Sequence, residues 1–204
     1  MNKKLNVLLA ALVILVLGIS APAMAKKQVP KVDNFIYFID HSSSMAFSYK
    51  GQRYVQFGGV SKIMMAKSLA RELNKMTPEL GFKAGLYTFA PYKEYAAMAP
   101  YNQATMASAI EKIQTDYTVY GRLTPMGKGL EDLDKIPVST LSGKTGVFIF
   151  SDGDSNLGVD PVAVAQSLKA KYGDNLCFYI IDLSDNKHDQ KNSGRPGRLG
   201  RAGK

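Results

Sequence analysis

The chain has 204 residues, 46% of them hydrophobic and 21% charged, and its formal net charge is +9. Seven of its basic residues stand in two terminal segments that contain no acidic residue: two in residues 1–25 and five in residues 191–204. Residues 26–190 are left with a net charge of about +2, which does not support a nucleic-acid-binding surface on the folded domain.

Residues 1–25 have the pattern of a secretory signal. Two lysines form a basic start, an apolar run covers residues 5–18, and an Ala-Met-Ala sequence ends at Ala25. The apolar run is shorter than the roughly 20 residues that a membrane-spanning helix needs, and a small-residue cleavage pattern follows it directly. We therefore expect this segment to be removed on export, which leaves a domain at residues 26–190.

The first half of the domain predicts two strands, a helix and an edge strand. Residues 35–39 and 82–89 are apolar runs of the kind found in buried strands. A helix is predicted over residues 61–76, and its apolar positions recur at helical spacing: Met65, Leu69, Leu73 and Met76. Residues 94–98 predict an antiparallel partner of the second strand, and Pro100 favours an edge position.

The second half alternates helices and strands. A helix is predicted over residues 103–114, capped by Asn102, with Met106, Ile110 and Ile113 on its apolar face. Further helices are predicted over 124–136 and 160–173, the second of them capped by Asp160. Buried strands are predicted over 147–150 and 176–183. Cys177, the single cysteine, is predicted to be a small buried residue of the last strand.

Strands separated by helices predict a doubly wound α/β fold. We expect a mainly parallel sheet with helices on both faces and one antiparallel edge strand. Residues 191–204 are rich in glycine and arginine and have one large apolar residue. This composition predicts a disordered basic tail.

Polar residues that can bind a cation follow two of these strands and begin one of the helices. Asp40, Ser42 and Ser44 come directly after the first strand, Thr124 begins a helix, and Asp152 lies just after the strand over 147–150. Doubly wound sheets bind ligands at the carboxyl ends of their strands, so we expect these side chains to converge. Carboxylate and hydroxyl oxygens suit a hard cation such as Mg²⁺.

The order of these residues, Asp40-x-Ser42-x-Ser44, then Thr124, then Asp152-Gly, resembles the metal-ion-dependent adhesion site (MIDAS) of von Willebrand factor A domains. The resemblance covers about residues 32–185. It implies that the five residues hold Mg²⁺, or Mn²⁺ or Ca²⁺ in its place. It also implies a non-catalytic binding module, in which an acidic group of a protein or envelope ligand completes the coordination of the metal.

The signal and the long segment 46–59 resemble a narrower group of exported bacterial proteins. These carry an A domain ahead of an OmpA-like, peptidoglycan-binding domain, which implies a place in the periplasm or cell envelope. The sequence lacks an OmpA-like part and the last strand and helix of an A domain. We interpret residues 191–204 as the product of a shifted reading frame, so that outer-membrane or peptidoglycan association would depend on a missing C-terminal domain.

Two alternatives stay open. Asp40 at a strand end suits the nucleophile of a Mg²⁺-dependent phosphoryl hydrolase, but Ser42 stands where that class needs a second acid, and the sequence places no lysine near a phosphate. The chain could also be a truncated fragment without function. His41 has no second histidine at metal-binding spacing and is interpreted as a loop residue.

Overall fold

The structure is a computed structural model that describes residues 31–47, 60–116, 123–135, 137–153 and 155–184. The predicted signal at residues 1–25 and the predicted tail at residues 191–204 lie outside these ranges, and so does most of the segment 46–59. Among the described helices, none combines the length and the apolar character needed to cross a bilayer.

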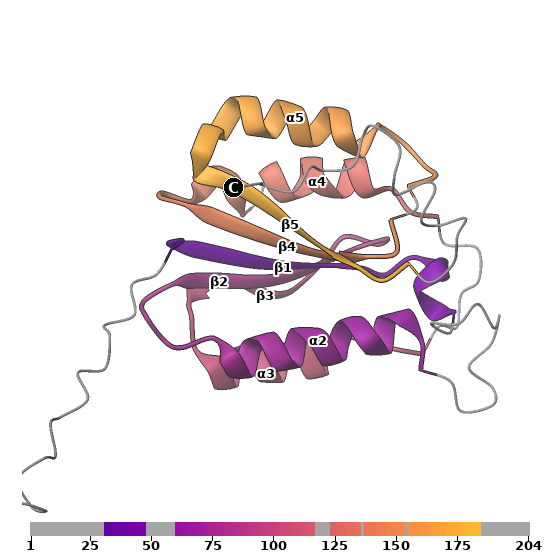
Figure 1. Ribbon diagram of the computed structural model, residues 1–204, viewed down its shortest axis with the longest axis horizontal. Coiled ribbons are helices and arrows are strands. Elements are labelled where there is room, and N and C mark those ends of the chain that lie inside the picture. Colours follow the sequence, from indigo (N-terminus) through magenta and orange to yellow (C-terminus); the bar gives the residue numbers. More distant parts are fainter. Residues whose placement is uncertain (1–30, 48–59, 117–122, 136, 154, 185–204) are drawn as a thin grey trace, which may run out of the picture.

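Five strands form one sheet in the order β3-β2-β1-β4-β5 (Figure 1). They are β1 (Asn34–Asp40), β2 (Lys83–Phe89), β3 (Lys93–Pro100), β4 (Thr145–Ser151) and β5 (Leu176–Asp182). β1 pairs in parallel with β2 and β4, β4 pairs in parallel with β5, and β3 runs antiparallel to β2 at the edge. The predicted doubly wound α/β sheet with one antiparallel edge strand is confirmed.

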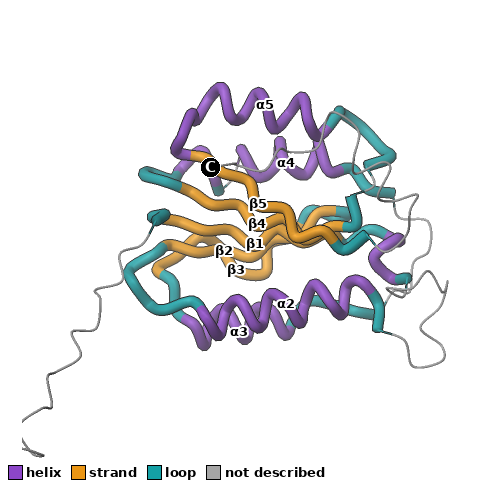
Figure 2. The backbone as a smooth tube through the Cα atoms, in the orientation of Figure 1, coloured by secondary structure: helices purple, strands orange, loops and turns teal. Residues whose placement is uncertain are grey.

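Helices cover both faces of this sheet (Figure 2). One face carries α2 (Lys62–Met76) and α3 (Gln103–Glu111), and the other carries α4 (Met126–Lys135) and α5 (Pro161–Tyr172). Three short 3-10 turns complete the described elements: η1 (Ser43–Ala46), η3 (Val138–Thr140) and η4 (Gly173–Asn175). The predicted caps are present, since Asn102 accepts from the Thr105 N–H at 2.9 Å and Asp160 accepts from the Val162 N–H at 3.0 Å.

The central strand β1 divides the core into two layers. All seven of its residues are buried, and successive side chains point to opposite faces of the sheet. Phe35, Tyr37 and Ile39 pack in the layer under α2 and α3, whereas Ile36 and Phe38 pack in the layer under α4 and α5. A continuous apolar run is therefore required here, because both faces of this strand are covered.

The buried face of α2 differs from the predicted one. Leu69 and Met76 are 38% and 70% exposed, whereas the fully buried residues are Ile63, Ala66 and Ala70. Alanine is small enough to let a helix backbone approach the sheet closely, and here that close approach prevails over the larger side chains of the Met65–Met76 stripe. The prediction of the face was right only in part, because Met65 and Leu73 pack against this core layer as partly buried residues. The helix and its end were predicted correctly.

The strand β5 is less buried than the sequence predicts. In the described sheet it lies at the edge beside β4, and Tyr179 and Ile180 are 41% and 39% exposed. Tyr179 stacks on Phe148, with ring centroids 5.0 Å apart. Cys177 is only partly buried, because an edge strand has one neighbour to cover it rather than two.

Candidate metal centre

Two carboxylates lie where the strand order of the sheet reverses. From β1 the chain proceeds outward to β2 and β3 on one side, and then to β4 and β5 on the other. The carboxyl ends of β1 and β4 therefore form the topological switch point, at which sheets of this type bind ligands. Asp40 is the last residue of β1, and Asp152 directly follows β4, so the structure brings these two predicted site residues together.

Asp40 is completely buried, and both of its carboxylate oxygens accept hydrogen bonds. The Ser42 N–H donates to Oδ1 at 2.8 Å, and the Ser151 hydroxyl donates to Oδ2 at 2.7 Å. Burial, and next the negative charge of Asp152, raise the pKa of Asp40 to about 7, although the hydrogen bonds act in the opposite direction. The ionised form of Asp40 therefore needs an additional positive charge nearby.

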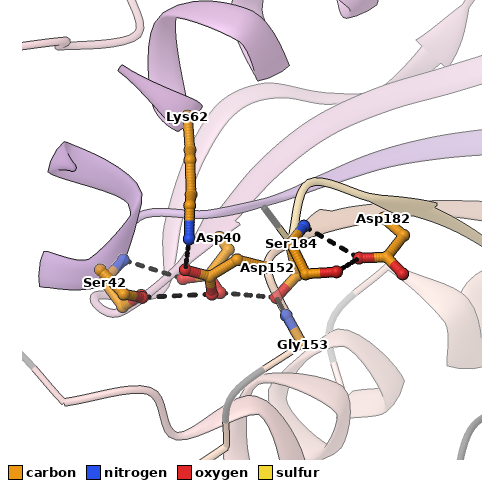
Figure 3. Close-up of polar contacts among 9 residues, drawn as sticks. Asp40, Ser42, Lys62, Asp152, Gly153, Asp182 and Ser184 are labelled. Carbon is orange, nitrogen blue, oxygen red and sulfur yellow. Dashed lines mark hydrogen bonds and ion pairs between the residues drawn. The ribbon is translucent and has the colours of Figure 1, made fainter. Parts of the chain in front are cut away.

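Two serine hydroxyls connect the ends of β1 and β4. Ser42 precedes the turn η1 and Ser44 lies within it, while the completely buried Met45 anchors this turn in the core under α2. The two hydroxyls lie 3.0 Å apart, and that of Ser44 donates to Asp152 Oδ1 at 3.2 Å. Asp40, Ser42, Ser44 and Asp152 thus form one connected group, which we call the oxygen cluster. Figure 3 shows Asp40, Ser42 and Asp152 close together.

Thr124 is buried just before α4 and belongs to the same end of the sheet through a loop. Its N–H donates to Asn156 Oδ1 at 2.9 Å, and its carbonyl accepts from the Ser155 hydroxyl at 3.2 Å and from the Asn156 N–H at 3.3 Å. Ser155 and Asn156 stand just beyond Asp152, so these bonds fix the start of α4 against the chain that leaves the cluster. The role of Thr124 as a metal ligand stays a prediction.

Sequence reasoning missed a buried lysine in this site. The Lys62 ammonium donates to Asp152 Oδ2 at 3.0 Å, and its side chain is 4% exposed. Figure 3 shows it extending from the start of α2 toward Asp152. Lys62 stands four and eight residues before Ala66 and Ala70, so it shares their face of the helix. Assigning those alanines to the buried face would have indicated that Lys62 points inward.

Two further polar residues support the loops of the site. The Ser151 hydroxyl, which donates to Asp40, also accepts from the Gly153 N–H at 3.1 Å and so orients the backbone on both sides of Asp152. His41 is buried, and its Nε2 lies 2.8 Å from the carbonyl oxygen of Gln114. That contact ties the loop after β1 to the chain beyond α3, in agreement with its interpretation as a loop residue.

The oxygen cluster fits a hard divalent cation in its chemistry. Its two carboxylates and two hydroxyls are ligands of the type that Mg²⁺ and Ca²⁺ accept. Lys62 supplies one positive charge against two carboxylates, so the group keeps a net negative charge when both carboxylates are ionised. Within the described ranges, no group of three or more His, Cys, Asp or Glu residues could hold a metal, so a cation here would depend on the serine hydroxyls.

Solved structures with the same fold include the following three. The PilB minor pilin of Streptococcus sanguinis matches with a TM-score of 0.62 and 15% identity, over 86% of this chain and 57% of the pilin. Proximal thread matrix protein 1 from the mussel byssus, with a zinc-occupied MIDAS motif, matches with a TM-score of 0.54 and 20% identity, over 72% of this chain and 37% of that protein. Manganese-loaded TRAP protein of Plasmodium vivax matches with a TM-score of 0.53 and 19% identity, over 78% and 60%.

The chain spans less than two thirds of the length of each of these three proteins. No family model matches the sequence, and no curated protein matches it either. At sequence identities of 20% or less, these matches show that the fold is shared and show nothing about function. The strand order, the single antiparallel edge strand and these structural matches together show that the chain has a von Willebrand factor A-like fold.

Proposed function

We propose that this chain is a non-catalytic, divalent-cation-dependent binding module of the bacterial cell envelope. The observation that carries the proposal is the oxygen cluster, in which two buried carboxylates and two hydroxyls meet at the switch point of the sheet. Two structural neighbours are described with a divalent metal, zinc in one and manganese in the other, which supports a divalent cation here.

The proposed ligands of Mg²⁺, or of Mn²⁺ or Ca²⁺ in its place, are the five predicted residues: Asp40, Ser42, Ser44, Thr124 and Asp152. When bound, the cation would supply a position that accepts a carboxylate oxygen from an acidic group of a partner. Two of these five proposed ligands are carboxylates, and the other three are neutral hydroxyls. Such a ligand set neutralises a divalent ion without adding an excess of negative charge, so a partner's carboxylate is not repelled.

The location in the envelope is supported by two independent features. Residues 1–25 have the basic start, apolar run and small-residue end of a secretory signal. Among the structural neighbours is a minor pilin. The proposed partner is therefore a protein or envelope ligand with an accessible acidic group.

Substitution of Asp152 tests the cation site. At a free cation concentration 100-fold above Kd, a folded protein gains about 2.7 kcal/mol, so Mg²⁺ or Mn²⁺ should raise the melting temperature of the wild-type chain above its value in EDTA. Asp152→Ala should abolish this rise. Asp174→Ala is the matched control, because Asp174 is fully exposed in a surface pair with Lys169 and should keep the full rise. A cation-dependent rise that persists in Asp152→Ala would refute the proposed site.

The acidic partner is tested with a pair of immobilised peptides that differ only in Glu against Gln. We expect the wild-type chain to bind the Glu peptide in Mg²⁺ and to release it in EDTA. It should not bind the Gln peptide in either Mg²⁺ or EDTA. Equal binding of the two peptides would show that a carboxylate is not what the site recognises.

The phosphoryl hydrolase is the second candidate, and Lys62 is the observation that favours it. Lys62 supplies, next to Asp152, the lysine that the sequence did not place. Against it, Asp40 is completely buried with both oxygens accepting hydrogen bonds, which makes it a poor nucleophile, and Ser42 still stands where a second acid is needed. Mg²⁺-dependent turnover of p-nitrophenyl phosphate that is lost in Asp40→Asn would favour the hydrolase over the binding module.

A further inference from the structure

The ion pair between Lys62 and Asp152 lies inside the proposed cation site. The Lys62 ammonium is 3.0 Å from Asp152 Oδ2, and the two side chains are 4% and 2% exposed. The other oxygen of Asp152 accepts from the Ser44 hydroxyl, so a single carboxylate joins the lysine to the oxygen cluster. Figure 3 shows the lysine and the cluster meeting at this carboxylate.

The backbone holds Lys62 in position. The Lys62 N–H donates to the Phe47 carbonyl at 3.0 Å, which ties the first residue of α2 to the residue that follows η1. Ser61 caps the helix, and its hydroxyl accepts from the Met64 N–H at 3.3 Å. The start of α2 is thus fixed against the turn that carries Ser44, and the side chain of Lys62 emerges beside the cluster.

A buried ammonium is stable only when it is paired and hydrogen-bonded. Asp152 provides that pairing, whereas the oxygens of Asp40 accept from the Ser42 N–H and the Ser151 hydroxyl. Lys62 therefore uses the same carboxylate that a divalent ion needs, and two cations on one buried carboxylate repel each other strongly.

We propose that the Lys62 ammonium is a built-in competitor of the divalent cation, bound to Asp152 in the metal-free protein and displaced from it when the ion binds. This inference rests on the proposed function and adds its regulation. Lys62 stabilises the metal-free cluster and weakens the affinity of the site, so that the site fills only where the cation is abundant.

The test compares Lys62→Met with the wild-type chain in two measurements: Mn²⁺ affinity by calorimetry at fixed pH and ionic strength, and melting temperature in EDTA. Methionine keeps an unbranched apolar chain without the charge. We expect Mn²⁺ to bind Lys62→Met at least tenfold more tightly, and the melting temperature in EDTA to fall because Asp152 loses the ion pair with Lys62. Lys62→Arg keeps a positive charge and should restore an affinity close to that of the wild type.

Lys67→Met is the matched control. Lys67 lies on the same helix, its side chain is 15% exposed, and it pairs with Glu111 away from the cluster. Its substitution should leave the Mn²⁺ affinity unchanged. Equal or weaker Mn²⁺ binding by Lys62→Met than by the wild type overturns the inference and leaves the proposed function standing. Absence of Mn²⁺ binding by both proteins overturns the inference and the proposed function together.

If Lys62→Met does not fold in EDTA, a measurement on the wild type alone tests whether the cation displaces Lys62 from Asp152. Lysine acetylation is followed residue by residue by mass spectrometry, in EDTA and in saturating Mg²⁺. Displacement predicts that Lys62 is protected in EDTA and becomes several-fold more reactive in Mg²⁺, while the exposed Lys75 reacts equally in both. Unchanged reactivity of Lys62 overturns the inference.

Discussion

The burial of Asp40 couples the stability of the metal-free protein to pH. Its carboxyl has a pKa of about 7 in the folded protein, against 3.8 for an unperturbed side chain, and burial is the main cause. The folded state therefore holds a proton that the unfolded chain releases at much lower pH. By linkage, this group contributes stability at low pH, and the contribution is lost as the pH rises through about 7.

In EDTA, we therefore expect the ionisation of Asp40 to lower the melting temperature of the wild-type chain as the pH rises from about 4 to about 7. Above about pH 7 this contribution should no longer change. Asp40→Asn cannot lose a proton there, so its melting temperature should fall less over this window. The measurement is a series of thermal melts with both proteins in the same buffers. Parallel curves for the two proteins would contradict the assignment.

The same proton competes with a divalent ion for Asp40. Because a metal ligand must be deprotonated, the rise in melting temperature caused by Mg²⁺ should be larger at pH 8 than at pH 5.5. Cation binding and proton release then occur at the same buried carboxyl group, that of Asp40.

At the scale of elements, sequence patterns were sufficient where a segment has one clear environment. The buried run at residues 35–39 and the capped helix starts at Asn102 and Asp160 all appear as predicted. The polar residues predicted at the strand ends do lie together, because the sheet topology places them there, while their role as metal ligands stays a prediction. For α2 the pattern identified only part of the buried face. The spacing of large apolar side chains defines a stripe but does not show that small residues beside it lie deepest against the sheet. That single error also hid Lys62.

Gly127 in α4 lies in close contact with the backbone of Val159. Helix propensity alone would not indicate this contact. In an exposed helix, alanine is more favourable than glycine by about 1 kcal/mol. Here a Cβ at residue 127 would lie 2.1 Å from the carbonyl oxygen of Val159, which belongs to the chain between Asp152 and α5. α4 therefore packs against this segment backbone to backbone.

We expect Gly127→Ala to destabilise the protein by roughly 1–3 kcal/mol, the usual range for overpacking, and also to weaken Mg²⁺ binding by displacing the segment beyond Asp152. The measurements are urea unfolding and the cation-dependent melting shift. Lys128→Ala is the control, because Lys128 is exposed and forms a surface pair with Asp132, and it should change stability by less than about 1 kcal/mol. A Gly127→Ala protein as stable as this control would refute the close packing.

For the whole molecule, the sheet separates two core layers and places the site at one edge of both. Stability and cation affinity should therefore be separable. Ile110 of α3 is completely buried in the layer under α2, and α3 contributes no residue to the oxygen cluster. Truncation of such a side chain removes packing without touching the ligands.

Ile110→Ala should lower the free energy of unfolding by about 2–5 kcal/mol, while the Mg²⁺ dissociation constant of the folded protein stays within a factor of two of the wild type. Asp152→Ala should show the opposite pattern, with cation binding lost. Urea unfolding and calorimetry give the two quantities separately. A large loss of Mg²⁺ affinity in Ile110→Ala would show that the site depends on the packing of the whole layer.

The central place of β1 also has a consequence for biosynthesis. This strand leaves the ribosome before the other strands of the sheet, yet Asn34 pairs with Thr145, 111 residues later in the chain. Until β4 has been made, an apolar and aromatic segment has at most one of its two neighbours, and such segments aggregate readily. Productive folding should therefore depend on a holding chaperone, and co-expression of such a chaperone should raise the yield of native protein over aggregates.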